Sequence, residues 1–321
     1  MKPELSVVVA SHDRPLRLRW LLNALEQQTL PREKWEVVVG HDSSGPETDE
    51  LLRTHPLALD GTLRYATRPP GTAPPGANRN AALEIARADT VVFTDDDCRP
   101  PADWLENVLA ARDRHPDCIV QGVTVKDPSE LVITHAPHLH AVTVYPPTPW
   151  AECTNMIYPR HWIDAVRGFD EQQMTGEDTD LNFRCQKAGA KYVGDRGFIT
   201  YHAVVEVSFL QVLRGRWRWK DLPYLIKKHP ELRANFPMWV FWKRTHFWFP
   251  FFLFGLWGVR RKSLALAVFC APYAVHSVGK HGTNPRGRYR NLIEWPTHVA
   301  VDVVEMAALA RGSAKYRTFF I

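Results

Sequence analysis

The chain has 321 residues, of which 45% are apolar and 23% are charged, a composition typical of a folded globular protein. This length suits one large domain or two modest ones. The five cysteines form no C-x-x-C pair, which disfavours a cysteine-based metal cluster, and their scattered odd number fits a reducing compartment. We expect no signal peptide, because the apolar run near Met1 is short and Asp13 soon closes it.

Positive charge is concentrated in one segment of the second half. The net charge is +5, but residues 211–262 hold 12 Lys and Arg against 2 Asp and Glu, so the rest of the chain is net acidic. The same segment carries six of the 12 tryptophans. A nucleic acid, a membrane surface or a phosphorylated substrate would each suit such a segment.

The first half of the chain alternates predicted strands and helices. Short runs rich in apolar residues predict strands over 5–10, 35–40 and 90–94, and a further strand is predicted over 63–65. The intervening patterns predict helices beginning at Pro15 and over 78–88. This order predicts an α/β fold, a Rossmann-like mixed and mostly parallel sheet with helices on both faces. Ligands bind beyond the carboxyl ends of such strands, where the polar clusters 11–14, 41–44 and 95–97 fall.

The composition changes near residue 206, and we expect two domains, residues 1–205 and 206–321. Apolar stretches cover 247–259 and 263–279, and each is shorter than the roughly 20 residues of a simple membrane-spanning helix. Residues 299–309 predict an amphipathic helix with Asp302 and Glu305 on its polar side. The second domain is therefore predicted to be a helical hydrophobic region.

The acidic triplet Asp95, Asp96 and Asp97 directly follows the predicted strand 90–94. Three adjacent carboxylates repel one another, and a divalent cation relieves that repulsion. Carboxylate oxygens suit Mg²⁺ or Mn²⁺, which bridge the phosphates of nucleotides. A solvated loop in which one aspartate caps the next helix is the structural alternative, but the position at a strand end favours a site.

Five blocks in order resemble glycosyltransferase family 2, whose fold is called GT-A, over about residues 5–205. They are Leu5–Arg14, Val37–Ser44 (Val-Val-Val-Gly-His-Asp-Ser-Ser), Gly76–Asn80 (Gly-Ala-Asn-Arg-Asn), Asp95–Asp97, and Gly168–Glu171 followed by Gly176–Leu181. The resemblance implies an inverting enzyme that moves a sugar from a nucleotide-diphosphate sugar to a hydroxyl acceptor. His41 departs from the family, which usually has an aspartate there, so the preference for uridine is less firmly implied.

The resemblance also implies roles for individual residues. Asp97 and His202 would hold Mn²⁺ or Mg²⁺, and Asp95 would contact the ribose. Other expected contacts of the nucleotide sugar are Ser11, Asp13, Arg14, Asp42, Arg79 and Asp96, with Asp13, Asp42 and Arg79 framing the base pocket. A structural histidine is the alternative for His202, a turn residue for Asp42, and a surface residue for Arg79.

The acceptor side is predicted from Glu177, Asp178 and Asp180. Asp178 would take the proton from the acceptor hydroxyl, with Glu177 and Asp180 in support. Thr175 with Asp178 also fits a capping box for a helix that runs to Ala188, and the two interpretations are compatible. The tryptophans Trp217 and Trp219 would flank the acceptor or pack against a membrane.

The basic, aromatic segment favours a membrane over nucleic acid as its partner, because it continues into long apolar stretches. We therefore expect an anionic membrane surface, a lipid-linked or cell-envelope glycan as acceptor, and a location at the cytoplasmic face of the membrane. A buried helical subdomain is the alternative. A sugar nucleotidyltransferase is disfavoured because residues 11–15 lack glycine, and an inactive relative that serves as a membrane-bound partner is disfavoured by the intact triplet.

Overall fold

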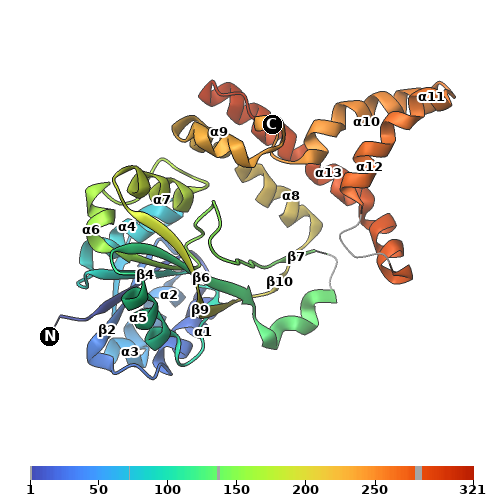
Figure 1. The fold of residues 1–321 in the computed structure, drawn as a ribbon. Coiled ribbons are helices and arrows are strands. Elements are labelled where there is room, and N and C mark those ends of the chain that lie inside the picture. Colours follow the sequence, from blue (N-terminus) through green and yellow to red (C-terminus); the bar gives the residue numbers. More distant parts are fainter. Residues whose placement is uncertain (1, 72, 136–137, 279–283) are drawn as a thin grey trace. The chain divides into compact units, whose positions relative to one another are not determined.

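The computed structural model describes residues 2–71, 73–135, 138–278 and 284–321 (Figure 1). Its internal contacts divide the chain into two compact units, Met1–Glu206 and Val207–Ile321. Each unit is described by itself.

The first unit is built on an eight-stranded mixed sheet. Four parallel strands form one side of it: β3 (Leu63–Thr67), β2 (Trp35–His41), β1 (Leu5–Ser11) and β4 (Thr90–Thr94). The sheet continues through β8 (Asn155–Pro159), β6 (Cys118–Lys126), β9 (Lys191–His202) and β5 (Cys98–Arg99). β8 is antiparallel to both β4 and β6, while β6 and β9 run parallel. The prediction of a mixed, mostly parallel sheet is therefore confirmed.

Helices cover both faces of this sheet, as predicted, because buried valines on each strand alternate between two apolar clusters. Val7 and Val9 pack with α1 (Pro15–Glu26) and α5 (Trp104–Arg114), whereas Val8 packs with α4 (Pro75–Ile85) and α7 (Glu177–Lys187). The remaining elements are η1 (Arg32–Lys34), α2 (Pro46–Thr54), α3 (Pro56–Leu59), η2 (Pro128–His135), α6 (Arg160–Ala165), and the antiparallel pair β7 (Leu139–His140) and β10 (Val205–Glu206).

Two local features fix the elements that carry the site. Gly40 on β2 lies so close to α4 that an added Cβ would stand 1.9 Å from the carbonyl oxygen of Asn78. The predicted capping box at Thr175 is wrong, since α7 begins after Gly176, which has a left-handed φ of 76° and makes no side-chain cap. Glycine adopts this conformation without steric cost, so the chain turns sharply just before Glu177.

The second unit is helical within the described residues. Its elements are α8 (Phe209–Trp217), η3 (Arg218–Asp221), α9 (Leu222–Lys228), η4 (Pro230–Asn235), η5 (Pro237–Trp239), α10 (Arg244–Arg260), α11 (Leu264–Ala267), η6 (Val268–Cys270), α12 (Ala271–Ser277) and α13 (Pro285–Tyr316). The predicted apolar stretches become α10, which continues through Pro250, and the segment from α11 to α12. Gly279, the last residue of the second stretch, lies outside the described residues.

The helices α10 and α11–α12 form a hairpin (Figure 1). Gly255 and Gly258 on α10 allow close packing, because an added Cβ would meet Cys270 and Leu266. Among the residues that the structure describes, we find no helix that is both long and apolar enough to cross a membrane. The prediction that Asp302 and Glu305 lie on a polar side of their helix is wrong, because both are buried on α13.

Candidate active site

Loops that follow β1 and β4 meet at the carboxyl edge of the parallel strands. The hydroxyl of Ser11 donates to Asp96 Oδ2 at 2.8 Å, and Arg14 Nη1 lies 2.9 Å from Asp97 Oδ2 and 3.4 Å from Asp96 Oδ1. The parallel register of β1 and β4 explains this meeting, since both strands end at the same edge. The structure therefore brings together Ser11, Arg14 and the acidic triplet.

The carboxyl of Asp96 is perturbed by its surroundings. Burial, together with the charges of Asp97 and Asp95, raises the pKa of Asp96 to about 7, although Arg14 and the Ser11 hydroxyl oppose the rise. The carboxyl of Asp96 faces inward to Ser11 and Arg14 rather than to solvent. Its contacts thus fix the loop after β1 on the triplet.

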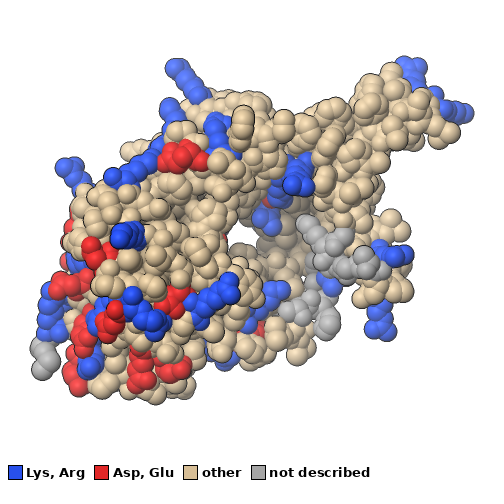
Figure 2. Space-filling model, in the orientation of Figure 1, with Lys and Arg blue, Asp and Glu red and all other residues tan. Residues whose placement is uncertain are grey.

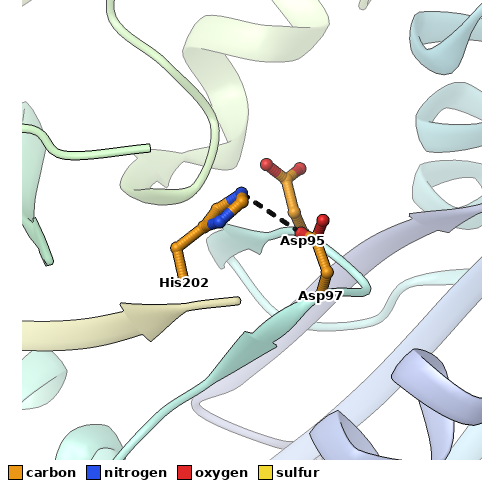
Figure 3. A group of neighbouring side chains, drawn as sticks. All are labelled: Asp95, Asp97 and His202. Carbon is orange, nitrogen blue, oxygen red and sulfur yellow. Dashed lines mark ion pairs between the residues drawn. The ribbon is translucent and has the colours of Figure 1, made fainter. Parts of the chain in front are cut away.

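Asp95, Asp97 and His202 form a group whose ligand atoms lie within 4.8 Å of one another (Figure 3). His202 ends β9, while both aspartates stand on the turn between β4 and β5 (Figure 3). The Nδ1–H of His202 donates to the carbonyl oxygen of Ala203 at 2.8 Å, because a carbonyl can only accept.

The resulting tautomer makes the group suitable for a metal ion. With Nδ1 protonated, the neutral imidazole of His202 presents a lone pair on Nε2, which lies 3.3 Å from Asp97 Oδ1. Two buried acceptors at this separation are stabilised by a cation, either a proton on the ring or a metal bound by both. Nitrogen and carboxylate oxygen together suit Mn²⁺ or a related divalent ion. The residues present therefore fit the predicted metal site.

Arg79, which was predicted to help frame the base pocket of a nucleotide, lies at the centre of a second cluster of charged residues. Its buried guanidinium donates to Asp95 at 2.9 Å, Glu177 at 3.0 Å and Asp178 at 2.8 Å, and it lies over the ring of Phe169. Arg79 therefore links the acidic triplet to the start of α7. The alternative that it is an ordinary surface residue is wrong, since its side chain is only 5% exposed.

Asp178 is held from two directions. One carboxylate oxygen pairs with Arg79, and the other accepts the backbone N–H of Cys153 at 2.9 Å. Both oxygens retain a further lone pair, because an ionised carboxylate has about four acceptor positions. Asp180 is buried and accepts from Arg184 Nε at 2.8 Å, an i,i+4 pair within α7.

The predicted base pocket joins the loops after β1 and β2. Asp13 accepts from the backbone N–H of Ser44 at 2.6 Å, and this hydrogen bond lowers its pKa. Asp42 accepts from Asn78 at 2.8 Å and from the N–H of Ala73 at 3.1 Å. Burial alone would raise the pKa of Asp42, but these bonds lower it. The buried carboxylate of Asp42 thus holds the surrounding loops together through its hydrogen bonds, which an ordinary exposed turn residue would not do.

His41, the departure from the family pattern, contacts Thr67 and Asp49. Its Nε2 lies 3.1 Å from Thr67 Oγ1 and 3.3 Å from Asp49 Oδ1, and burial lowers its pKa.

Trp217 and Trp219 belong to the second unit, where Trp219 packs on the ring of Trp242. Their role beside an acceptor stays a prediction.

Three contributors to the site were missed from the sequence. Asn78 binds Asp42, Asn80 bonds to both the N–H and the carbonyl of Phe169, and the N–H of Cys153 holds Asp178. The two asparagines lie within the Gly76–Asn80 block, so their position could have marked them. The backbone donor has no side-chain signal and could not have been found.

Comparison with known proteins identifies the family. The model of the family described as Glycosyl transferase family 2 matches residues 6–181, more than half of the chain. Glycosyltransferase AglE of Haloferax volcanii is 30% identical over 105 residues, which are 32% of this chain and 34% of that protein. The poly(ribitol-phosphate) beta-N-acetylglucosaminyltransferase TarS of Staphylococcus aureus is 30% identical over 110 residues, 34% of this chain and 19% of TarS. The matches thus span about a third or less of these relatives.

Solved structures show the same fold. The mannosyltransferase PcManGT from Pyrobaculum calidifontis, in complex with GDP-Man and Mn²⁺, has a TM-score of 0.57 at 17% identity, covering 99% of this chain and 88% of its own. TarS residues 1–349 in complex with UDP-GlcNAc have a TM-score of 0.53 at 16% identity, covering 99% and 90%. The expected GT-A type of fold is confirmed, and the chain belongs to glycosyl transferase family 2.

Proposed function

We propose that this chain transfers a sugar from a nucleotide-diphosphate sugar, preferably a UDP-sugar, to a hydroxyl acceptor with inversion at the anomeric carbon. The observation that carries the proposal is the linkage by Arg79 of the Asp95–Asp97 turn to Asp178. A candidate donor site and a candidate base thereby share one guanidinium. TarS with UDP-GlcNAc and PcManGT with GDP-Man and Mn²⁺ support a nucleotide-sugar donor.

The donor is proposed to lie along the carboxyl edge of β1, β2 and β4. Asp13, Asp42 and the loops that they join would border the base, while Asp95 would accept from the ribose. Ser11, Arg14 and Asp96 form the floor beneath the diphosphate. The cationic Arg14, whose side chain is 51% exposed, is available to pair with phosphate oxygens.

Asp97 and His202 are proposed to hold a divalent ion, Mn²⁺ or Mg²⁺, beside the diphosphate. Such an ion, when bound, neutralises negative charge on the leaving group. The carboxylate of Asp97 would then exchange part of its pairing with Arg14 for the ion. His202 keeps its orientation through the carbonyl of Ala203, which fixes Nε2 toward Asp97.

The base in this proposal is Asp178. The acceptor oxygen forms the new bond to the anomeric carbon, the bond from that carbon to the phosphate oxygen breaks, and the nucleoside diphosphate leaves with the electron pair. The hydroxyl proton passes to a carboxylate oxygen of Asp178. Because Arg79 and the N–H of Cys153 hold Asp178 rigidly, the free lone pairs have a fixed direction. Glu177, which shares Arg79 with Asp178, and Asp180 are proposed to support Asp178 in this role.

The reaction is tested by incubating the full chain with Mn²⁺ and UDP-glucose, UDP-GlcNAc or GDP-mannose, with and without membrane extract. We expect nucleoside diphosphate release from a UDP-sugar, and a fall in kcat of about 10²- to 10⁴-fold in Asp178→Asn. The control Asp164→Asn alters an exposed carboxylate outside the site and should leave release unchanged. Release unaltered in Asp178→Asn would contradict the base assignment, and release unaltered in Asp97→Ala would contradict the metal assignment.

Two other products would point to the alternatives. Pyrophosphate in place of nucleoside diphosphate would indicate a sugar nucleotidyltransferase. No release from any donor, with or without extract, would indicate an inactive relative that acts as a binding partner.

We propose further that the α10–α12 hairpin lies at the cytoplasmic face of an anionic membrane and that the acceptor is a lipid-linked or cell-envelope glycan. Trp257 is 48% exposed and Leu264 is 89% exposed on this hairpin. Arg260, Arg261 and Lys262 connect its arms, and Figure 2 shows basic side chains at the end of an otherwise largely uncharged surface. Each basic residue near anionic lipid contributes about 1 kcal/mol.

An apolar groove of about 530 Å³ between the two arms adds to the surface available to lipid, with Trp248, Phe251, Phe269 and Val275 among its lining residues. Flotation with vesicles tests the proposal. We expect the chain to float with anionic but not with neutral vesicles, and Trp257→Ser to weaken this binding. Trp20→Ser is the matched control, since Trp20 is an exposed tryptophan of the first unit. Equal failure to float with both kinds of vesicle would contradict the proposal.

A further inference from the structure

A second group of potential metal ligands lies inside the second unit, formed by His246 on α10 with Asp302 and Glu305 on α13. One ligand atom from each residue lies within 4.8 Å of the others. The two carboxylates are one helical turn apart, so they project from the same face of α13. All three side chains are buried, and the imidazole of His246 is fully so.

The imidazole of His246 faces the carboxylates, but its contacts with them are longer than typical hydrogen bonds. Its Nε2 lies 3.4 Å from Glu305 Oε2 and 3.7 Å from Asp302 Oδ1, and neither ring nitrogen has a hydrogen-bond partner among the described residues. Ligands bound at 2.0–2.2 Å in a tetrahedral zinc site are about 3.4 Å apart. The observed separations resemble the edges of such a tetrahedron.

Neighbouring side chains orient the carboxylates and balance their charge. The hydroxyl of Tyr273 donates to Asp302 Oδ2 at 2.9 Å, which leaves Oδ1 turned toward His246. The ammonium of Lys243 pairs with Glu305 Oε2 and lies 3.6 Å from Asp302 Oδ1, so it approaches the same two oxygens as the imidazole. Lys243 therefore stands where a cation would bind.

Positively charged side chains balance the two carboxylates of the cluster. Burial opposes ionisation of both carboxyls, but His246 and Lys243 lower the pKa of Asp302 and of Glu305, and the carboxylates raise the pKa of His246 against the effect of its burial. Lys243 and Arg216, whose Nε lies 3.4 Å from Glu305 Oε1, offset the two negative charges, and a proton on the ring adds a third positive charge. A divalent ion that replaced the ring proton and the Lys243 ammonium would supply two positive charges from one point and leave the net charge unchanged. Lys243 is 36% exposed and precedes α10, so its side chain has room to leave.

We propose that His246, Asp302 and Glu305 bind a divalent transition-metal ion of the zinc class and that Lys243 holds its place in the metal-free chain. Imidazole nitrogen and carboxylate oxygen are both ligands of zinc in proteins, and three protein ligands leave a fourth position for water. Tyr273 is the outer partner that fixes Asp302. The ion would join the first turn of α10 to α13, and its binding would displace the ring proton and the ammonium.

Cobalt is a suitable probe, because Co²⁺ in a tetrahedral site has strong visible absorption. The full chain carrying Asp97→Ala, which removes the metal group of the first unit, is titrated with Co²⁺ and then with Zn²⁺. We expect one equivalent of Co²⁺ to bind with a tetrahedral spectrum, and Zn²⁺ to displace it and raise the midpoint of thermal unfolding. No binding at a stoichiometric concentration would overturn the proposal.

Variants of the cluster separate a metal site from a purely structural ion-pair network. Adding His246→Ala should abolish the spectrum, whereas the control His276→Ala, at an exposed histidine of α12, should keep it. Tyr273→Phe should weaken Co²⁺ binding by about 10- to 100-fold, as loss of an outer partner does. Lys243→Met should tighten it by removing the competing ammonium. A tetrahedral Co²⁺ spectrum retained in His246→Ala would refute the site. Co²⁺ binding unchanged in both Tyr273→Phe and Lys243→Met would refute it as well, so the test does not depend on the folding of a single variant.

Discussion

Replacing Arg79 by methionine tests the cluster that joins the two sides of the candidate active site. The guanidinium makes ion pairs of 2.8 to 3.0 Å with Asp95, Glu177 and Asp178, whose side chains are 28%, 12% and 20% exposed. Methionine keeps much of the apolar volume and the contact with Phe169 but leaves three carboxylates facing one another. The variant therefore removes the charge with little change in packing.

The cost follows from the burial of Arg79. Removing one partner of a buried ion pair destabilises a protein by about 3–5 kcal/mol, because the other charge is left without compensation. Three partly buried carboxylates share this arginine, so we expect a loss in the free energy of unfolding of about 3–5 kcal/mol. Arg79→Lys should fall between, since a single ammonium keeps the charge but cannot reproduce the planar fork that reaches three carboxylates.

Urea denaturation at pH 7 measures this loss, and nucleoside diphosphate release measures its effect on activity. Arg68→Met is the control, because Arg68 pairs with Glu171 in an exposed pair worth about 0–1 kcal/mol. The loss in Arg79→Met should also shrink at acidic pH, where the orphaned carboxylates take up protons. A variant as stable as Arg68→Met at pH 7 would refute the argument from burial.

Two further substitutions test the scaffold. Gly40→Ala should destabilise the chain by about 1–3 kcal/mol or more, because its Cβ would meet the backbone of Asn78, whereas Gly215→Ala in α8 meets nothing and should be neutral or stabilising in thermal unfolding. Asp195→Asn should cost about 1.5–3 kcal/mol at pH 7 in urea denaturation, since Asp195 accepts two bonds from Arg114. Although burial opposes it, hydrogen bonding lowers the pKa of Asp195 in the folded chain. The cost should therefore begin to shrink as the pH falls below about 4, the pKa of an unfolded aspartate, and be lost as the pH falls through the lowered pKa; a cost that stays constant below about pH 4 would contradict this.

Much of the first unit is readable from local sequence. The valine-rich runs predicted β1, β2 and β4 to within one residue, because strands buried on both faces are continuously apolar. The third strand, β3, was predicted two residues shorter than the structure has it. The position of the acidic triplet after β4 likewise placed it at the ligand-binding edge. The family resemblance implied a site at Asp95, Asp97 and His202, and the structure places these three together.

What the sequence could not determine depends on contacts between residues far apart in the chain. Arg79 was predicted to help frame a base pocket, which stays a prediction, but its pairing with Glu177 and Asp178 was not foreseen. These partners lie about a hundred positions later, and only the packing of α4 beside α7 brings them within reach. The backbone donor at Cys153 carries no side-chain signal at all. Such contacts follow from how the elements pack and not from any local pattern.

In the second unit, too, contacts between distant residues decide what the sequence pattern could not, namely the burial of Asp302 and Glu305. Periodicity placed Asp302 and Glu305 on the polar side of a helix, and the chemistry of carboxylates made a solvent-facing position the ordinary expectation. In the folded unit His246 and Lys243 cover that face, so the carboxylates become buried. The sequence by itself determined the elements and the acidic edge of the sheet. Tertiary structure alone decided which charges meet, because a buried charge needs a partner that the chain supplies from elsewhere.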